Sequence, residues 1–466
     1  MVKRDIAEIA DLVGETLRKK SVDGYELYID RASHFDVESK EGKVDTFQAS
    51  RTSGMALRVL KGHRMGFSYA TSLLSPDAGK EDFSRGISRM VEDAIASAEA
   101  TSPDPCYDFA PPLSDPPRLL SIFDGDIEGI SEKTKINMAI LLEKAAHSVD
   151  PQNIKKVRKA GYQDGHSRRT LFNSNGFQFS YEVTVCSVSV TAIAERSGES
   201  EVGWDFDYSH FFKSLDVEKA GRAAGTQALE RLGGRRIPSG LYPVLLQNSL
   251  ASEFLSLLSH SFLAEQVLKG KSPLKDKQGE IFFSPNLTIV DDGLLPEGIS
   301  TTPVDGEGTP SLRTPVVVEG RIAGYLYNRY WANRMKSASP ASQAESTGNS
   351  RRPGVKGPPD MGISNLFVLP GKASFPALLE GLHRGVLVDE VMGLHTVDPI
   401  SGDFSLGCSG QWVEKGKRIH PVKSIAIAGN LFELFRKVIG VGEDLRFFGG
   451  VGSPSLLIEG LNIGGE

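Results

Sequence analysis

The sequence is poor in cysteine and contains no long apolar run. Its 466 residues include only three cysteines, Cys106, Cys186 and Cys408, which lie far apart. This usage is typical of a reducing compartment, and it excludes a disulfide framework or a cysteine-based zinc knuckle. No apolar run approaches the roughly 20 residues of a membrane span, and the first residues mix charges into an apolar pattern, unlike a signal peptide. We therefore expect a cytoplasmic protein without a membrane anchor.

An excess of positive charge is missing as well. The formal net charge is −6 at pH 7. Domains that bind nucleic acid usually gather lysine and arginine on one face, so nucleic acid is not an expected partner. A chain of this length rarely forms a single core, so two or three domains are predicted.

The signature motifs of common hydrolases and nucleotide-binding enzymes are also absent. The chain has no P-loop, no G-x-S-x-G and no H-E-x-x-H, and its nine histidines are scattered. The nearest approach to a zinc site is H-S-F-L-A-E, in which His260, Ser261 and Glu265 offer one imidazole and no adjacent carboxylate base. Catalytic zinc needs three protein ligands, so the residues themselves predict neither a metal ligand nor a catalytic residue.

Residues 1–232 are predicted to form an α+β domain of helices packed on an antiparallel sheet. Alternating apolar residues predict four short strands between residues 25 and 71, with hairpin turns at Glu41–Gly42 and Lys61–Gly62. A further strand carries Cys186 on its apolar face, where a buried thiol is the expected role. Apolar residues at helical spacing predict helices over residues 3–20, from Pro76 to Ala98, 131–148 and 214–232.

Residues 233–240 (GGRRIPSG) are predicted to link this domain to a second, strand-rich and barrel-like domain over residues 241–466. Many short apolar runs with glycine turns support this prediction, among them IFFS at 281–284. Residues 336–360 lack apolar periodicity and are predicted to form a long surface loop, for which a functional role stays open.

One long helix over residues 248–271 is predicted to organise the second half of the chain. Its apolar residues recur at helical spacing after a short strand at Tyr242–Leu246. Asn248 or Ser249 is the expected N-cap, and Gly270 is the expected stop. Read without any comparison, this is a buried or partner-facing helix and not a metal site.

Six segments of the chain carry motifs that, taken together, resemble the TldD/PmbA family. They include STGN and GVGEDLRFFGGVGSPSL and occupy residues 38–71, 101–106, 304–335, 346–349, 395–434 and 440–465. This family is also called the modulator-of-DNA-gyrase or microcin-maturation family. The resemblance covers essentially the whole chain. It implies an α+β N-terminal domain, a barrel-like C-terminal domain and an enclosed cavity in which an unfolded peptide is cut.

The family contains two kinds of subunit, and the resemblance distinguishes them at three positions. TldD-type chains carry H-E-x-x-x-H on a helix and a cysteine near the C-terminus, and they hold a catalytic metal, taken to be zinc. In the matching register His260 takes the first histidine, Ser261 replaces the glutamate base and Glu265 replaces the second histidine. The segment FFGGVGSPSL has no cysteine. The resemblance therefore implies a PmbA (TldE)-type subunit without its own metal, paired with a TldD-type subunit that holds the zinc.

The resemblance further implies that this chain lines the substrate cavity, where an unfolded peptide would bind by strand addition. For each candidate a purely structural role stays open: Arg313 would pair with a neighbouring acid, and Asp403 would cap the turn at Gly402. The candidates at motif-matching positions are His260, Ser261, Glu265, Glu307, Arg313, Asn349 and Asp403.

Two other functions stay open beside the subunit of a two-chain metallopeptidase. The chain could be a peptidase in its own right, working as a homodimer, or a regulatory protein of the gyrase-modulator type that binds without cutting. A homodimer is also expected where the isolated chain occupies its partner's surface.

Overall fold

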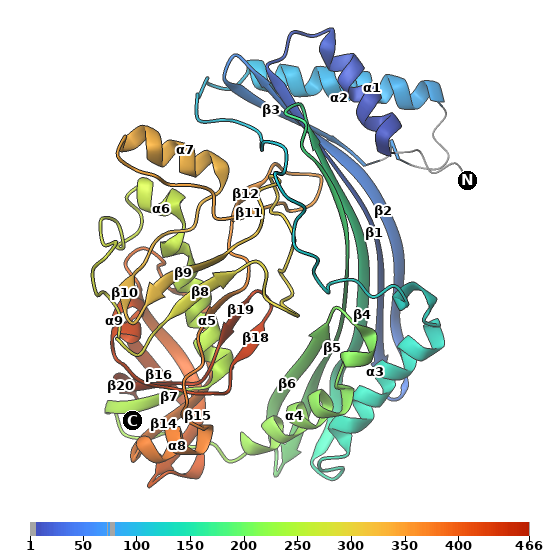
Figure 1. Cartoon of the computed structure of the whole chain (residues 1–466). Helices are drawn as coiled ribbons and strands as arrows, with labels where there is room; N and C mark the ends of the chain where they lie inside the picture. Colours follow the sequence, from blue (N-terminus) through green and yellow to red (C-terminus); the bar gives the residue numbers. More distant parts are fainter. Residues whose placement is uncertain (1–5, 72, 75–79, 466) are drawn as a thin grey trace.

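The computed structural model describes residues 6–71, 73–74 and 80–465. A long curved sheet forms one side of the molecule, and a body of helices and shorter strands forms the other (Figure 1). The first residues of the predicted helices at 3–20 and from Pro76 lie outside the described residues. Within the described part of the chain, no helix is long and apolar enough to cross a membrane.

The curved sheet is antiparallel throughout, with the strand order β3-β2-β1-β4-β5-β6. The prediction of four short strands is wrong, because β1 and β2 run on for 17 and 19 residues without a break. The hairpin turn at Glu41–Gly42 is confirmed, whereas the second turn lies at Gly62–His63, one residue later than predicted, because Lys61 still pairs with Arg64. Gly42 and Gly62 have positive φ in these turns. The strands are β1 Gly24–Lys40, β2 Lys43–Lys61, β3 Arg64–Ala70, β4 Ile154–Asn173, β5 Gln178–Arg196 and β6 Glu199–Ser209.

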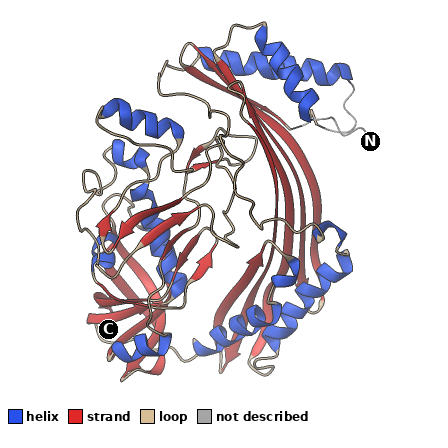
Figure 2. Ribbon diagram, in the orientation of Figure 1, coloured by secondary structure: helices blue, strands red, loops and turns tan. Residues whose placement is uncertain are grey.

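Helices cover the two ends of one face of this sheet (Figure 2). At one end α1 (Ile6–Arg18) and α2 (Lys80–Glu99) pack on a core that contains Leu27 and Leu57. At the other end α3 (Glu132–His147) and α4 (Val217–Glu230) pack over Cys186, which is fully buried as predicted. The opposite face, which carries Tyr28 and Leu171, packs against Val304 of the C-terminal body.

A closed barrel lies in the C-terminal body, and this confirms the barrel-like architecture. Five strands follow one another in the order β16-β15-β14-β7-β20, and pairing of β16 with β20 closes the ring. A sixth strand, β17 (Val438–Val441), flanks β20. The barrel strands are β7 Gly240–Leu246, β14 Arg384–Met392, β15 Asp403–Glu414, β16 Lys417–Asn430 and β20 Leu456–Gly464.

A second sheet of short strands packs on the other side of helix α5 (Asn248–Ser259), which contacts both β14 and β19. The run IFFS is not one of its strands: Ile281 makes only an isolated bridge to Arg321. Helices α8 (Phe375–Gly381) and α9 (Leu431–Arg436) complete the body. The sheet consists of β10 Arg321–Ile322, β9 Arg313–Val318, β8 Ile289–Asp292, β13 Leu366–Val368, β19 Val451–Ser453 and β18 Arg446–Phe448.

The single long helix predicted over residues 248–271 is wrong, because the chain leaves the helix at Leu263. After α5 a short 3-10 turn covers His260–Phe262, and α6 covers Ala264–Leu268. Leu263 is extended and forms a parallel bridge with Leu326, so a tertiary backbone contact replaces the helical hydrogen bonds. The predicted N-cap is wrong, since Gln247 is the N-cap residue of α5. The predicted stop is confirmed, because Gly270 follows the C-cap of α6 and has a positive φ.

The prediction of a surface loop at 336–360 is correct only in part. The first residues of this segment belong to helix α7 (Arg329–Ala338). Towards the end of the segment, strand β11 (Ser350–Arg351) pairs with strand β12 (Asp360–Met361). Ser350 and its neighbour Asn349 are fully buried. This segment is therefore anchored in the interior, against the loop that carries Asp305.

Candidate functional site

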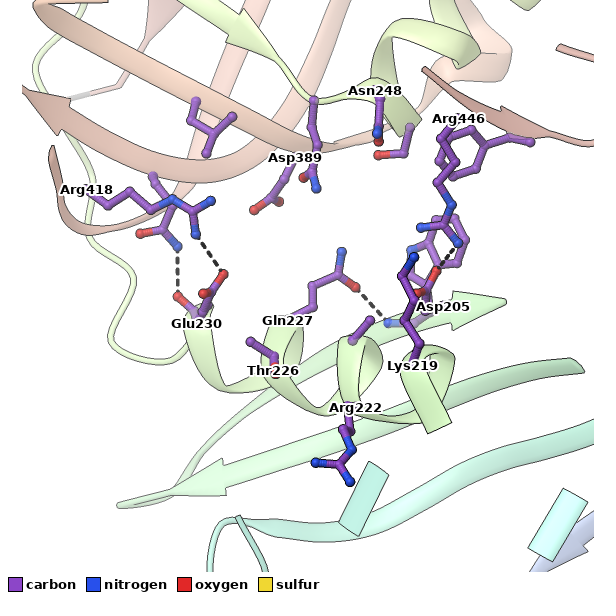
Figure 3. Close-up of a pocket in the computed structure, with 17 residues that line it drawn as sticks. Asp205, Lys219, Arg222, Thr226, Gln227, Glu230, Asn248, Asp389, Arg418 and Arg446 are labelled. Carbon is purple, nitrogen blue, oxygen red and sulfur yellow. Dashed lines mark hydrogen bonds and ion pairs between the residues drawn. The ribbon is translucent and has the colours of Figure 1, made fainter. Parts of the chain in front are cut away.

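A cavity of about 630 Å³ lies between α4 and the C-terminal body (Figure 3). Surfaces from distant parts of the chain meet there: β6 and α4 supply one wall, and α5, β14, β15, β16 and β18 supply the other. The lining residues are Trp204, Asp205, Lys219, Arg222, Ala223, Thr226, Gln227, Glu230, Gln247, Asn248, Ser249, Leu387, Asp389, Gln411, Arg418, Arg446 and Phe448. We refer to it below as the α4 cavity.

The amphipathic pattern of α4 places its polar face in this cavity. The side chains of Ala220, Ala224 and Ala228 are buried against α3 and the sheet, so the residues between them point away from the sheet. Asp216 starts the helix by accepting a hydrogen bond from the Lys219 backbone N–H at 3.1 Å. The polar face that results carries charges of both signs, one hydroxyl and one amide: Lys219, Arg222, Glu230, Thr226 and Gln227.

Two contacts tie this face to the barrel at one end of the cavity. Arg418 of β16 forms an ion pair with Glu230 at 3.1 Å, and Gln411 of β15 donates to the Glu230 carbonyl at 2.8 Å. Deeper in the wall, Asp389 of β14 is paired with Arg231 at 3.1 Å. The two halves of the chain are thus held together by charge-assisted contacts beside the cavity.

An aromatic ladder marks the other end. Trp204, Phe206 and Tyr208 alternate along β6 and stack with ring centroids 6.0 Å apart. Arg446 of β18 lies over the Phe206 and Phe448 rings, at 5.1 and 5.2 Å from their centroids, and pairs with Asp205 at 2.5 Å. Burial raises the pKa of Asp205 in spite of this arginine. This end therefore offers flat apolar surface beside a fixed cation.

Side chains already occupy the free edge of β6. Gln227 accepts from the Trp204 backbone N–H at 2.7 Å, and the Val202 and Phe206 carbonyls accept from Arg231 and Arg446 at 2.8 and 2.7 Å. An extended peptide therefore cannot add to this strand without displacing them. In the α4 cavity a peptide would meet side-chain amides, ion pairs and aromatic rings instead.

The cavity contains no arrangement typical of nucleophilic or metal-dependent catalysis. Within the described residues, no three histidine, cysteine, aspartate or glutamate side chains gather as a metal-binding group. All three thiols are buried, and burial raises the pKa of Cys186 and of Cys408 to about 12, which makes them poor nucleophiles.

The structure separates the predicted residues of the organising helix. His260 is exposed at the end of α5, Ser261 is buried in the 3-10 turn, and Glu265 pairs with Lys269 on α6. The predicted H-E-x-x-x-H register therefore crosses the break at Leu263. A motif that ended at His260, the C-cap residue of α5, would place Leu255 and Ser256 at the first histidine and the base, which also leaves a single imidazole.

Two other predicted residues, Glu307 and Asn349, enter one buried polar network. Asp305 links them, since its carboxylate accepts from the backbone N–H groups of Glu307 at 2.9 Å and Ser350 at 3.1 Å. Glu307 pairs with Arg58 of β2 at 3.1 Å. Asn349 donates to Asp291 at 2.7 Å. Glu307 thus lies at the junction between the curved sheet and the C-terminal body, whereas Asn349 is buried within the C-terminal body.

The last two predicted residues lie outside both regions. Arg313 is exposed and pairs with Asp292 at 3.2 Å, which matches the structural role left open for it. Asp403 is exposed and accepts from Asn430 at 2.8 Å, at the end of the adjacent strand. Neither residue lines the α4 cavity.

Sequence reasoning missed the charged residues that complete the network. Arg58 donates twice to Glu26 of β1, at 2.8 Å each, and Arg352 also pairs with Glu26. Burial works to raise the pKa of Glu26, but these two arginines hold it below the usual value. Glu26 alternates with Tyr25 and Leu27 along β1, which indicates that its side chain lies on the opposite face of the strand. Only the fold shows that this second face is buried as well.

Comparison with known proteins agrees with this architecture over the whole chain. Three family models, described as PmbA/TldA metallopeptidase domain 1, central domain and C-terminal domain, match residues 25–98, 125–232 and 239–465. The Escherichia coli O157:H7 metalloprotease PmbA is 27% identical over 100% of this chain and 97% of its own length. A Haemophilus influenzae metalloprotease TldD homolog is 24% identical, covering 97% and 95%.

Solved structures show the same fold. A candidate modulator of a DNA gyrase from Thermotoga maritima superposes with a TM-score of 0.87 at 27% identity, over 98% of this chain and 100% of the other. TldE from Thermococcus kodakarensis gives a TM-score of 0.86 at 21% identity, over 98% and 100%. The chain therefore belongs to the PmbA/TldA metallopeptidase family.

Proposed function

We propose that this chain is the PmbA (TldE)-type subunit of a two-chain metallopeptidase that acts on unfolded peptides in the cytoplasm. The observation that carries the proposal is a family match along the whole chain combined with the absence of H-E-x-x-x-H from residues 255–265. Only His260 supplies an imidazole there, whichever register is used. Catalytic zinc requires three protein ligands, so we assign the zinc to a TldD-type partner subunit.

The α4 cavity supports a role in holding the peptide. An unfolded peptide presents backbone amides and side chains of every kind, and the cavity wall offers amides, both charge signs and aromatic rings. Such a mixed lining binds many sequences with modest selectivity, because polar groups fix the backbone while apolar surface accepts varied side chains.

The proposal is tested by adding the purified chain to a TldD-type chain from the same organism. We expect no zinc and no hydrolysis of an unstructured reporter peptide from this chain alone. The mixture should form a stable complex and cut the peptide. Replacing the glutamate base of the TldD-type chain with glutamine should abolish this hydrolysis. Stoichiometric zinc and chelator-sensitive hydrolysis by the isolated chain would instead establish the self-sufficient homodimeric peptidase.

A regulatory function is favoured by one observation, the structural match to a candidate gyrase modulator. Binding of this chain to purified gyrase, measured with and without a TldD-type chain, separates the two functions. Gyrase binding with no peptide hydrolysis in any mixture would favour the regulatory protein over the peptidase subunit.

A further inference from the structure

The strand edges at the α4 cavity are already occupied. Two strands end their sheets there, β6 and β18. On β6, the backbone N–H of Trp204 and the carbonyls of Val202 and Phe206 are bonded to side chains. Strand β18 has only three residues, and the side chain of its Arg446 reaches across to Asp205 of β6. Strand addition requires a run of unpaired backbone groups, and neither of these two edges provides it.

The side chain of Gln227 instead directs a hydrogen-bond donor into the cavity. Its carbonyl oxygen accepts from the Trp204 backbone N–H at 2.7 Å, which fixes the orientation of the amide. The NH2 group of this amide therefore points away from β6 and into the cavity (Figure 3). Among the described residues, no group accepts a hydrogen bond from it. A fixed amide donor of this kind is suited to the backbone carbonyl of a bound peptide.

Trp204 also places an indole ring at the cavity. The residue is 36% exposed and lines the cavity together with Phe448, whose ring meets the indole at 75° with 6.4 Å between the centroids. The ring of Phe206 stacks on the indole at 6.0 Å and holds it in place. Within the described part of the chain, the indole N–H has no hydrogen-bond partner. Trp204 thus offers flat apolar surface and a second donor beside Gln227.

Aromatic surface combined with side-chain donors favours a peptide in the polyproline II conformation. This conformation is common in unfolded chains and has no internal hydrogen bonds, so its carbonyls are free to accept from side chains. Peptides of this kind dock against aromatic rings. Proline fixes φ near the polyproline II value and lacks the N–H group that strand pairing uses. A segment that contains proline therefore loses little conformational freedom on binding here.

We propose that the α4 cavity binds proline-containing peptide segments in the polyproline II conformation. Trp204 is the stacking surface, and Gln227 donates to a backbone carbonyl of the peptide. This mode of binding differs from the strand addition that the family resemblance implies. That these segments belong to the substrates of a peptidase rests on the proposed function, whereas the binding itself does not.

The test is a titration of the isolated full chain with three hexapeptides that are acetylated and amidated at their ends. One consists of alanine and proline, one of threonine and valine, and one of glycine and serine. We expect saturable binding of the proline peptide, measured by calorimetry, at least about fivefold tighter than that of the other two, because its conformation is formed in advance. Strand addition would instead give the tightest binding to the threonine and valine peptide.

Two variants locate the site. Gln227→Glu keeps an oxygen that accepts from the Trp204 N–H and removes the NH2 donor, so the proline peptide should bind about tenfold more weakly. Trp204→Leu removes the indole and should also cost about tenfold in affinity. The matched control is Gln48→Glu, which adds the same charge at an exposed position of β2 and should bind as the wild type does.

Several results would overturn the proposal. They are equal affinity for the three peptides, tightest binding of the threonine and valine peptide, no saturable binding, or unchanged affinity in both variants. Tighter binding of a neutral oligosaccharide, maltohexaose, than of the proline peptide would also overturn it, because the aromatic surface would then be a sugar site.

The two proposals can fail separately. If the mixture with a TldD-type chain shows no hydrolysis but the proline peptide still binds through Gln227, the binding site stands and only its assignment to a peptidase substrate is lost. If the mixture cuts peptides while the isolated chain shows no preference for proline, the proposed function stands and the polyproline II site is wrong.

Discussion

At the scale of single residues, the junction between the two halves of the chain depends on buried charges. Arg58 forms ion pairs with both Glu26 and Glu307, and Arg352 forms a second ion pair with Glu26. Each carboxylate thus has a cationic partner, which buried acids need to stay ionised. Asp305 is different, because its partners are backbone N–H groups and its carboxylate neighbour Glu307 opposes its charge.

Replacing Asp305 with asparagine should flatten the pH dependence of stability. The folded-state pKa of about 7 lies above the roughly 3.9 of an unfolded aspartate, so the folded protein binds an extra proton between these values. This contribution is present at low pH and is lost as pH rises through about 7. Relative to Asp305→Asn, the wild type should lose about 1 kcal/mol of unfolding free energy between pH 6 and 8.

The measurement is urea unfolding of both proteins at several pH values. The groups around Asp305 that are also charged are Glu26, Glu307, Arg58, Arg351 and Arg352, and all are retained in the variant. Asp45→Asn, at an exposed position of β2, is the control and should follow the wild type. Parallel curves for the wild type and Asp305→Asn would show that this carboxyl does not titrate in the range.

At the scale of elements, the α4 cavity depends on how closely α4 approaches β6. A Cβ on Gly203 of β6 would lie 2.2 Å from the Ala224 carbonyl oxygen and 2.4 Å from the Ala228 nitrogen. Both are backbone atoms of the helix and cannot turn aside. Glycine at this position therefore sets the distance at which the polar face of α4 is presented.

Substituting Gly203 with alanine should push α4 away from the sheet. Overpacking of this kind costs about 1–3 kcal/mol, and we expect that loss in the unfolding free energy measured with urea. Gly129→Ala is the matched control, because nothing lies within 4 Å of a Cβ there. Equal midpoints for the two variants would mean that α4 has room to move.

Local patterns predicted most elements, and the exceptions share one cause. The helices, the hairpin turns and the apolar face around Cys186 follow from spacing that neighbouring residues determine. The helix break at Leu263 does not, because its cause is a bridge to Leu326, more than sixty residues along the chain. Likewise, the buried end of the 336–360 segment follows from the contact of Ser350 with Asp305.

At the scale of the whole molecule, the α4 cavity exists only because the C-terminal body faces the edge of the curved sheet. Trp204 sits at that edge, 36% exposed, with Phe448 of β18 edge-on at 6.4 Å. Aromatic side chains at the border of a cavity are common anchors for a bound chain. The proposed function therefore makes Trp204 a contact for substrate.

Trp204→Ala should weaken peptide binding by the complex of this chain with a TldD-type partner. We expect KM for an unstructured peptide to rise about tenfold with kcat unchanged, since the lost contact is made equally in the ground and transition states. Leu241→Ala, on β7 and 69% exposed, is the control and should leave both constants alone. A fall in kcat at constant KM would place Trp204 in the chemistry instead of in binding.

The sequence by itself determined the α+β class, the barrel-like second half and the family, because periodicity and motifs are local properties of the chain. It also singled out Glu307 and Asn349, yet only the tertiary structure decided that these two are buried while Arg313 and Asp403 lie on the surface. Whether a polar side chain meets water, a counter-charge or a cavity depends on elements that are distant in sequence. The α4 cavity is of this kind, because Glu230 pairs with Arg418 beside it only after the curved sheet and the C-terminal body have come together.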